Sequence, residues 1–157
     1  MGKHMFTNTD VVAKHLISET MRYYVTPEYI DKFGEPKVFS DLGHHSVALF
    51  RYTHVDQSRR AMLPNGEWQT VKNQFMTNDV NALTEAVKTS RYIAMLPERT
   101  HEDLVAQGKL IPLFREHPAI LMEVFLVHPS RRYISVVAQK FIDYLYSFAK
   151  PDKSPIS

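Results

Sequence analysis

The stretch from Thr77 to Phe114 reads TNDVNALTEAVKTSRYIAMLPERTHEDLVAQGKLIPLF, and it decides the fold because it signals the start and end of successive elements. Asn78 stands where a residue can cap a helix, and Tyr92 to Leu96 is a short apolar run that Pro97 stops, which is typical of a strand. Between them, apolar residues recur at helical spacing: Val80, Leu83, Ala86 and Val87.

The second half of the stretch repeats the pattern. Thr100 followed three residues later by Asp103 approximates a capping box, and Gly108 stands where a helix end favours a left-handed residue. Leu110 to Phe114 is then a second strand candidate. Helix, strand, helix, strand is an α/β pattern, in which ligands bind beyond the ends of the strands.

The composition is that of an ordinary globular protein. The chain has 157 residues, enough for one domain or two small lobes, with 44% hydrophobic and 23% charged residues. No run approaches the roughly 20 apolar residues that span a bilayer, and no signal peptide opens the sequence. The absence of cysteine fits the cytoplasm, and a net charge of +2 is too small to indicate nucleic-acid binding.

The N-terminal part predicts two strands and a helix. Thr9 to Leu16 alternates between apolar and polar residues, and Met21 to Val25 is expected as a separate second strand. In TPEYIDKFG, Thr26 caps a short helix that Gly34 ends. Ser40 to Leu42 is expected as a turn or a single helical turn. The first nine residues are interpreted as a tag or a disordered start.

A third strand and a hairpin follow. Ser46 to Tyr52 is expected as a strand, and the polar segment Thr53 to Arg60 as a mobile loop. Asn65-Gly66 is a strong hairpin signal, so Ala61 to Pro64 and Glu67 to Phe75 should pair as antiparallel strands.

The C-terminal part predicts a strand and a long helix. Leu121 to Val127 is almost continuously apolar, which indicates a strand buried on both faces. Pro151 then stops the helix, and residues 151–157 are expected to be a frayed tail. The apolar stripe of that helix consists of Ile134, Val137, Phe141, Leu145 and Phe148.

Taken in order, these pieces resemble the effector-binding domain of LysR-type transcriptional regulators. The matching segments are VTPEYIDKFGEP, DLGHHSVALFRY, NGEW, TNDVNALTEAV, IAMLPE, LVAQGKLIPLF and VFLVHPSRRYISVVAQKFIDYL, and together they cover nearly all of Asp10 to Phe148. The resemblance implies two α/β lobes like those of periplasmic binding proteins, joined by two crossing strands, with a small-molecule effector between the lobes. It implies a cytoplasmic ligand sensor rather than a catalyst.

This sequence departs from the family pattern in two ways. It contains no winged helix-turn-helix, so DNA binding would need a domain absent from this chain. Within a domain of residues 10–150, residues 26–114 would form a complete lobe, whereas 10–25 and 115–149 would be remnants of an incomplete one. Apolar side chains of the remnants would then either repack on the complete lobe or be buried against a second copy of the chain. The second alternative implies a homo-oligomer, which we expect. Thr89-Ser90-Arg91 stands where the family usually has glycines.

By matching position, the resemblance implies that the effector lies at the start of one helix and after two strands. Free amides and the helix dipole there favour an anionic effector, although Asp79 opposes it, and Asn78 has the alternative role of a plain helix cap. The effector-binding residues implied are Thr77, Asn78, Asp79, Tyr52, Thr53 and Pro97.

Other functions lack a signature. His44-His45 is the only adjacent histidine pair, and no HxH or HExxH spacing predicts a metal site. Ser46 and Ser130 lie near histidines, but neither is in a GxSxG elbow, and no cofactor motif is present. We therefore expect no metal, no cofactor and no membrane partner. Three hypotheses remain: the sensing part of a regulator, a headless module that pairs with intact regulators, and a small α/β enzyme.

Overall fold

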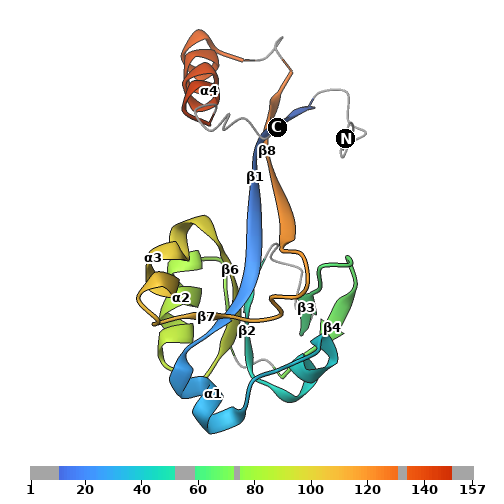
Figure 1. Ribbon diagram of the computed structural model, residues 1–157. Helices are drawn as coiled ribbons and strands as arrows, with labels where there is room; N and C mark the ends of the chain where they lie inside the picture. The colour runs from blue at the N-terminus through green and yellow to red at the C-terminus, as the bar shows by residue number, and fades with distance from the viewer. Residues whose placement is uncertain (1–10, 52–58, 73–74, 131–133, 150–157) are drawn as a thin grey trace. The chain divides into compact units, whose positions relative to one another are not determined.

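The computed structural model describes residues 11–51, 59–72, 75–130 and 134–149 (Figure 1). The chain divides into two compact units. Unit 1 comprises the chain up to Ser18 and from Glu123 onward, and unit 2 runs from Glu19 to Met122. Two longer strands belong to both units, β1 (Val11–Val25) and β8 (Ile120–Pro129), and β8 pairs with β1.

Unit 2 holds most of the regular structure. Its helices are α1 (Pro27–Phe33), α2 (Val80–Lys88) and α3 (Glu102–Ala106), with 3-10 turns at Phe39–His44 and Arg99–His101. Its shorter strands are β2 (Val47–Phe50), β3 (Arg60–Met62), β4 (Trp68–Thr70), β5 (Met76–Thr77), β6 (Ile93–Pro97) and β7 (Ile111–Pro112).

The main sheet of unit 2 is mixed, with the order β5-β2-β6-β1-β7. β2 is parallel to both of its neighbours, pairing Phe50 with Thr77 of β5 and Ala48 with Ala94 of β6. β1 is antiparallel to β6 and β7, with Met21 opposite Pro97. The sheet therefore sends the carboxyl ends of β5, β2 and β6 to one edge.

Side chains alternate between two apolar layers on either side of this sheet, as the period of a strand requires. On one side, Val47 and Leu49 of β2 join Tyr29 of α1 and Leu42 in a single core. On the other side, Ala48 lies among buried residues of α2, β6 and β1: Leu83, Ala86, Val87, Ala94, Leu96 and Tyr24. Both faces are covered, so unit 2 is a three-layer α/β structure.

Several sequence predictions for unit 2 are confirmed. The side chain of Thr26 caps α1 by accepting from the Tyr29 amide, and Gly34, with φ +80°, ends it. The hairpin pairs β3 with β4 around Gly66, whose φ is +83°, although the strands are shorter than predicted. Gly108, with φ +72°, follows α3. The predicted loop Thr53 to Arg60 lies outside the described residues up to Ser58.

Other predictions were wrong in detail. Thr9 to Leu16 and Met21 to Val25 are not two strands, because β1 continues from Val11 to Val25 without a break. Leu110 to Phe114 forms a strand only at Ile111–Pro112. Thr100 does not cap α3, since a 3-10 turn precedes that helix and its N-cap, His101, makes no side-chain capping bond.

The strand β8, which belongs to both units, and the helix α4 (Val136–Ala149) of unit 1 correct two expectations about burial. Leu121, Val124 and Val127 of β8 are exposed, so this apolar strand is not buried on both faces. On α4 the buried residue is Ile142, whereas Val137, Phe141 and Phe148 of the predicted stripe are exposed. The apolar pattern was recognised correctly, but the described chain supplies a partner for only one side of each element.

Candidate functional site

The candidate site lies at the edge of unit 2 where the parallel strands end. β5 ends at Thr77 and β6 at Pro97, and the Arg51 amide just beyond β2 donates to the Thr77 carbonyl at 2.8 Å. Because β5, β2 and β6 are parallel neighbours, Thr77, Pro97 and the chain after Phe50 emerge on the same side of the sheet. Tyr52 and Thr53 follow Arg51 but lie outside the described residues.

The start of α2 adds a polar turn to this edge. Asp79, not Asn78, is the N-cap, because its Oδ1 accepts from the Asn81 amide at 2.9 Å. Thr77 Oγ1 in turn accepts from the Asp79 amide at 3.1 Å. The backbone at Asp79 is extended (φ −119°, ψ 117°), and Val80 is the first helical residue, so the prediction of Asn78 as the cap was one residue too early. Asn78 is exposed beside the cap.

This capping changes the electrostatics expected at the helix start. A carboxylate at the N-cap already interacts with the positive end of the α2 dipole. Asp79 also uses the Asn81 amide, which would otherwise be available to an anion. The helix start therefore offers less to an anion than the sequence predicted, whereas Arg51, directly after β2, is an exposed cation.

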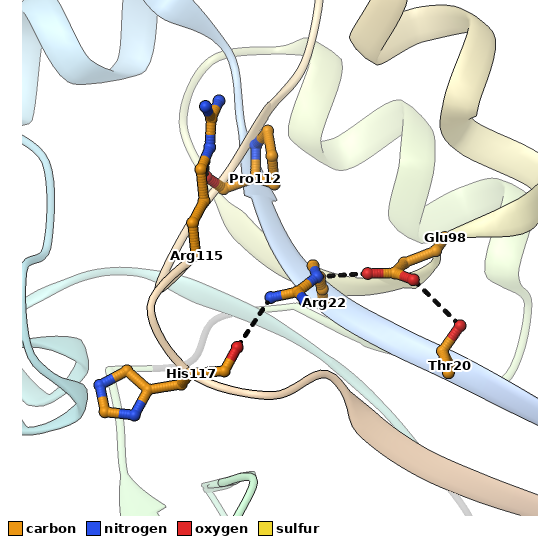
Figure 2. A network of polar contacts seen from close by, with 6 residues as sticks. All are labelled: Thr20, Arg22, Glu98, Pro112, Arg115 and His117. Atoms are coloured by element: carbon orange, nitrogen blue, oxygen red, sulfur yellow. Dashed lines mark hydrogen bonds and ion pairs between the residues drawn. The ribbon is translucent and has the colours of Figure 1, made fainter.

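An ion-pair network fixes the exit of β6 to the strand β1 (Figure 2). Arg22 pairs through Nε with Glu98, and its Nη1 donates to the His117 carbonyl at 3.1 Å. Thr20 Oγ1 donates to the other Glu98 oxygen at 3.1 Å, and the Glu98 amide donates to the Thr20 carbonyl at 2.9 Å. The chain leaving Pro97 is thus held against β1 by side chains and backbone together.

A buried histidine supports the same segment from the α2 side. His101 Nδ1 lies 2.8 Å from the Pro97 carbonyl, which can only accept, so Nδ1 carries a proton. Its Nε2 lies 2.8 Å from Thr84 Oγ1 on α2, and Tyr24 of β1 stacks on the ring at 6.1 Å. Burial raises the pKa of Tyr24 to about 12, with the Glu98 charge acting in the same direction. Tyr24 therefore stays a neutral packing residue.

The sequence predicted Thr77, Asn78, Asp79 and Pro97 as site residues, but it did not predict that Arg22, Glu98 and His101 support this edge. Arg22 and Glu98 are 76 residues apart, and nothing in the sequence pairs them. His101 carried a weak signal, because it stands four residues after Pro97, the distance over which its ring returns to the Pro97 carbonyl.

The other side-chain clusters do not suggest catalysis. Among the described residues, no group of three or more His, Cys, Asp or Glu side chains could hold a metal ion. Of the pair His44-His45, His45 is bonded through Nδ1 to the hydroxyl of Tyr29. Burial lowers the pKa of His45 and raises that of Tyr29 to about 12.

A separate cavity of about 520 Å³ lies near the start of β6, at the opposite end of the sheet from Thr77. Its walls include the cap of α1, the end of α2 and the end of α3. None of the predicted site residues lines it. The lining residues include Thr26, Glu28, Lys88, Ser90 and Lys109.

A lobe whose parallel strands end at a polar, firmly braced edge is the architecture of a ligand-binding domain. The chain belongs to the LysR substrate binding domain family, whose model matches residues 2–149. Its fold is accordingly the periplasmic-binding-protein-like α/β fold of that family.

Named relatives agree with this assignment. The transcriptional regulator CrgA of Neisseria meningitidis is 25% identical over 134 residues, which is 85% of this chain and 45% of CrgA. The uncharacterised regulator YcaN of Escherichia coli is 26% identical over 76% of this chain and 39% of its own. The chain thus spans about half the length, or less, of the curated relatives it matches.

Solved structures show the same fold at lower identity. The regulatory domain of CrgA superposes with a TM-score of 0.69 at 21% identity, covering 94% of this chain and 72% of that one. The regulatory domain of AphB from Vibrio vulnificus gives 0.67 at 18% identity, covering 91% and 71%. In the part of this chain that the structure describes, no helix is long and apolar enough to cross a membrane.

Proposed function

We propose that this chain is the effector-sensing part of a cytoplasmic LysR-type transcriptional regulator and binds a small molecule at the strand-end edge of unit 2. The observation that carries the proposal is the convergence of Thr77, Asn78, Asp79 and Pro97 at one edge of a family domain named for substrate binding. Tyr52 and Thr53, which the resemblance also implies as site residues, lie outside the described residues. Residues 26–114, which fall inside unit 2, are the complete lobe in this proposal, and 10–25 with 115–149 belong to the other.

The polar and charged groups at this edge limit the chemical class of effector that we propose. Asn78 is exposed and not used in capping, so its amide can donate and accept for a ligand. Asp79 disfavours negative charge next to the helix start. We therefore propose an effector with polar groups toward Asn78 and an anionic group toward Arg51, away from Asp79.

The relatives are transcriptional regulators, and the proposed role is recognition rather than catalysis. The contacts of Arg22, Glu98 and His101 hold the backbone and side chains of this edge in place. This favours binding by pre-organised groups. Sequence-specific DNA binding would require a helix-turn-helix, so a gel shift with promoter DNA should give no specific complex with this chain alone.

The test is a thermal-shift and calorimetric screen of small carboxylates, each beside its neutral amide. A binding carboxylate at 100 times its Kd should stabilise the fold by about 2.7 kcal/mol. Asn78→Ala should weaken it at least fivefold, and Lys109→Ala, at the opposite end of the sheet, should not. Equal affinities for carboxylates and their amides would refute the proposal of an anionic effector. A ligand whose binding is unchanged in Asn78→Ala but lost in Lys109→Ala would refute the proposed location of the site.

A second candidate function is an interaction module that pairs with other regulator chains, as a homo-oligomer or with intact relatives. The exposed apolar side chains of β8 and α4 favour it, because soluble proteins rarely leave such groups uncovered together. Sedimentation of the chain with and without a full-length relative separates this role from ligand sensing.

A further inference from the structure

The cavity of about 520 Å³ at the start of β6, which we call the β6-start cavity, has a buried floor and a charged rim. Its floor is formed by Thr26, Ser90 and Leu110, which are 7%, 3% and 2% exposed. Leu104 of α3 is half-buried and adds an apolar part of the wall. A concavity of this volume, with apolar walls and a few polar groups, is typical of a site for a small molecule. The charged residues that line it are exposed and form its rim: Glu28, Lys88 and Lys109.

Ser90 has a backbone conformation that points to a use for its hydroxyl. Its φ is +59°, in the left-handed region that residues with a side chain rarely adopt. Glycine would occupy the same position without steric cost. Residues other than glycine that are held in this region are concentrated at functional sites. The serine therefore gives the cavity a buried hydroxyl at a position where a glycine would be less strained.

Hydrogen bonds orient this hydroxyl and the carboxylate of Glu28. Thr26 Oγ1 accepts from the Tyr29 amide at 3.2 Å and lies 2.5 Å from Ser90 Oγ. Ser90 Oγ donates to Glu28 Oε2 at 3.4 Å. Both side-chain contacts are made when Thr26 donates to Ser90 and Ser90 donates to Glu28. The last of these bonds is long, so an oxygen atom of a ligand can replace Glu28 as the acceptor of the Ser90 proton.

Three helices each contribute one charge to the rim. Glu28 is in the first turn of α1, Lys88 is in the last turn of α2, and Lys109 follows α3. Lys88 Nζ already pairs with Glu85 Oε1 at 3.2 Å. Among the described residues no ion pair engages Lys109, so its ammonium group is the more available to a ligand.

The end of α3 fixes the backbone of Lys109 at the rim. The Lys109 amide donates to the Leu104 carbonyl at 2.9 Å, and the Gly108 amide donates to the Val105 carbonyl at 3.0 Å. Together with the positive φ of Gly108, +72°, these are the two bonds of a Schellman motif. Lys109 is therefore held beside the cavity by its backbone, while its flexible side chain can reach a ligand.

A rim with charges of both signs selects a ligand that carries both. A carboxylate without an amino group would bring its charge close to that of Glu28, and an amine without a carboxylate would meet Lys88 and Lys109. An α-amino acid carries an ammonium group and a carboxylate on one carbon atom, so it matches both signs at once.

We propose that the β6-start cavity binds a free α-amino acid with an apolar side chain. Its ammonium group pairs with Glu28, and its carboxylate pairs with Lys109 and accepts from Ser90. Its side chain packs on Leu104. This site is distinct from the strand-end edge proposed for the effector, since the two lie at opposite ends of the sheet. Carboxylates without an amino group belong to that edge, so failure of either proposal leaves the other testable.

Isothermal titration calorimetry of the full chain with L-leucine, L-methionine and L-phenylalanine tests the proposal. At least one of the three should bind with one site per chain, and loss of its amino group or of its carboxylate should weaken binding about tenfold or more. For L-leucine the matched compounds are 4-methylpentanoate and 3-methylbutylamine. The absence of binding by all three amino acids would overturn the proposal, as would equal binding of the compound without the amino group.

Variants of the rim locate the bound amino acid. Glu28→Gln and Lys109→Met should each weaken its binding about five- to tenfold, because each removes one charge pair. Two exposed residues outside the cavity supply matched controls: Glu67→Gln in the β3–β4 hairpin and Lys140→Met on α4. Both controls should leave the affinity unchanged. Losses of the same size in the controls would show a general effect of charge and overturn the site.

Ser90→Gly tests the floor of the cavity, because glycine keeps the positive φ and removes only the hydroxyl. It should weaken binding about three- to tenfold while thermal unfolding shows a folded protein, and an unchanged affinity would overturn the role of Ser90. Asn78→Ala should leave binding of the amino acid unchanged. If Asn78→Ala weakens it and Glu28→Gln does not, the amino acid occupies the strand-end edge, and the cavity is not its site.

Discussion

At the scale of single residues, the braced exit of β6 depends on one ion pair. The Arg22 and Glu98 side chains are 24% and 31% exposed, so the pair is largely screened from water. Arg22→Gln should lower the free energy of unfolding by about 1–3 kcal/mol, because Glu98 is left partly buried with only Thr20 as a side-chain partner.

Urea denaturation measures this change. Arg115→Gln is the control, since Arg115 is exposed and, among the described residues, donates to the Pro112 carbonyl alone, at 3.2 Å (Figure 2). It should cost less than about 0.5 kcal/mol. If both variants lower the free energy of unfolding by the same amount, the Arg22–Glu98 ion pair contributes no more to stability than an exposed arginine does.

The histidine bonded to Tyr29 makes stability depend on pH. Burial lowers the pKa of His45 below its ordinary value of 6.5, although Asp41 acts in the opposite direction. The unfolded chain therefore takes up a proton at a higher pH than the folded chain does. The contribution of His45 to stability is complete above about pH 6.5 and is lost as the pH falls below it.

Unfolding free energies at pH 7.5 and 5.5 should thus differ more for the wild type than for His45→Gln. The same loss in both proteins would show that His45 does not carry the dependence. Asp41, whose pKa is lowered by the Val38 and Lys37 amides, titrates below this window and should not interfere.

At the scale of elements, the cap of α2 gives the neighbouring residues Asn78 and Asp79 different roles. Asp79→Ala should destabilise the protein by about 1 kcal/mol, since it removes the acceptor of the Asn81 amide. Asn78→Ala should change stability by less than about 0.5 kcal/mol and act on ligand binding instead. Thermal unfolding of the two variants side by side decides this, and the opposite order would restore Asn78 as the cap.

The extent to which the sequence predicts the structure also differs between elements. The helix Pro27–Phe33 and the hairpin at Asn65-Gly66 were predictable because their caps and turns are local, set by Thr26, Gly34 and Gly66. β1 was predicted as two strands because local alternation weakens at Ser18 to Thr20, whereas the strand continues from Val11 to Val25 and pairs with β6, β7 and β8. Likewise, the exposure of Val137 and Phe141 depends on what the rest of the chain supplies, which periodicity alone does not reveal.

At the scale of the whole molecule, the site is the part that the sequence predicted least completely. The resemblance implied Thr77, Asn78 and Pro97 as site residues by matching position, and the sheet brings these three residues to one edge. Their supports, Arg22, Glu98 and His101, come from distant strands and turns and became visible only through their contacts.

The central proposal is that unit 2 senses a ligand and binds it at the carboxyl end of its parallel strands. Titration of the ¹⁵N-labelled chain with the carboxylate that stabilises it most, followed by NMR, tests this most directly. The account predicts the largest shifts at the amides of Thr77, Asn78 and Glu98, and little change at Ser90 and Lys109. Shifts concentrated at Ser90 and Lys109, with Thr77 to Asp79 unchanged, would contradict it.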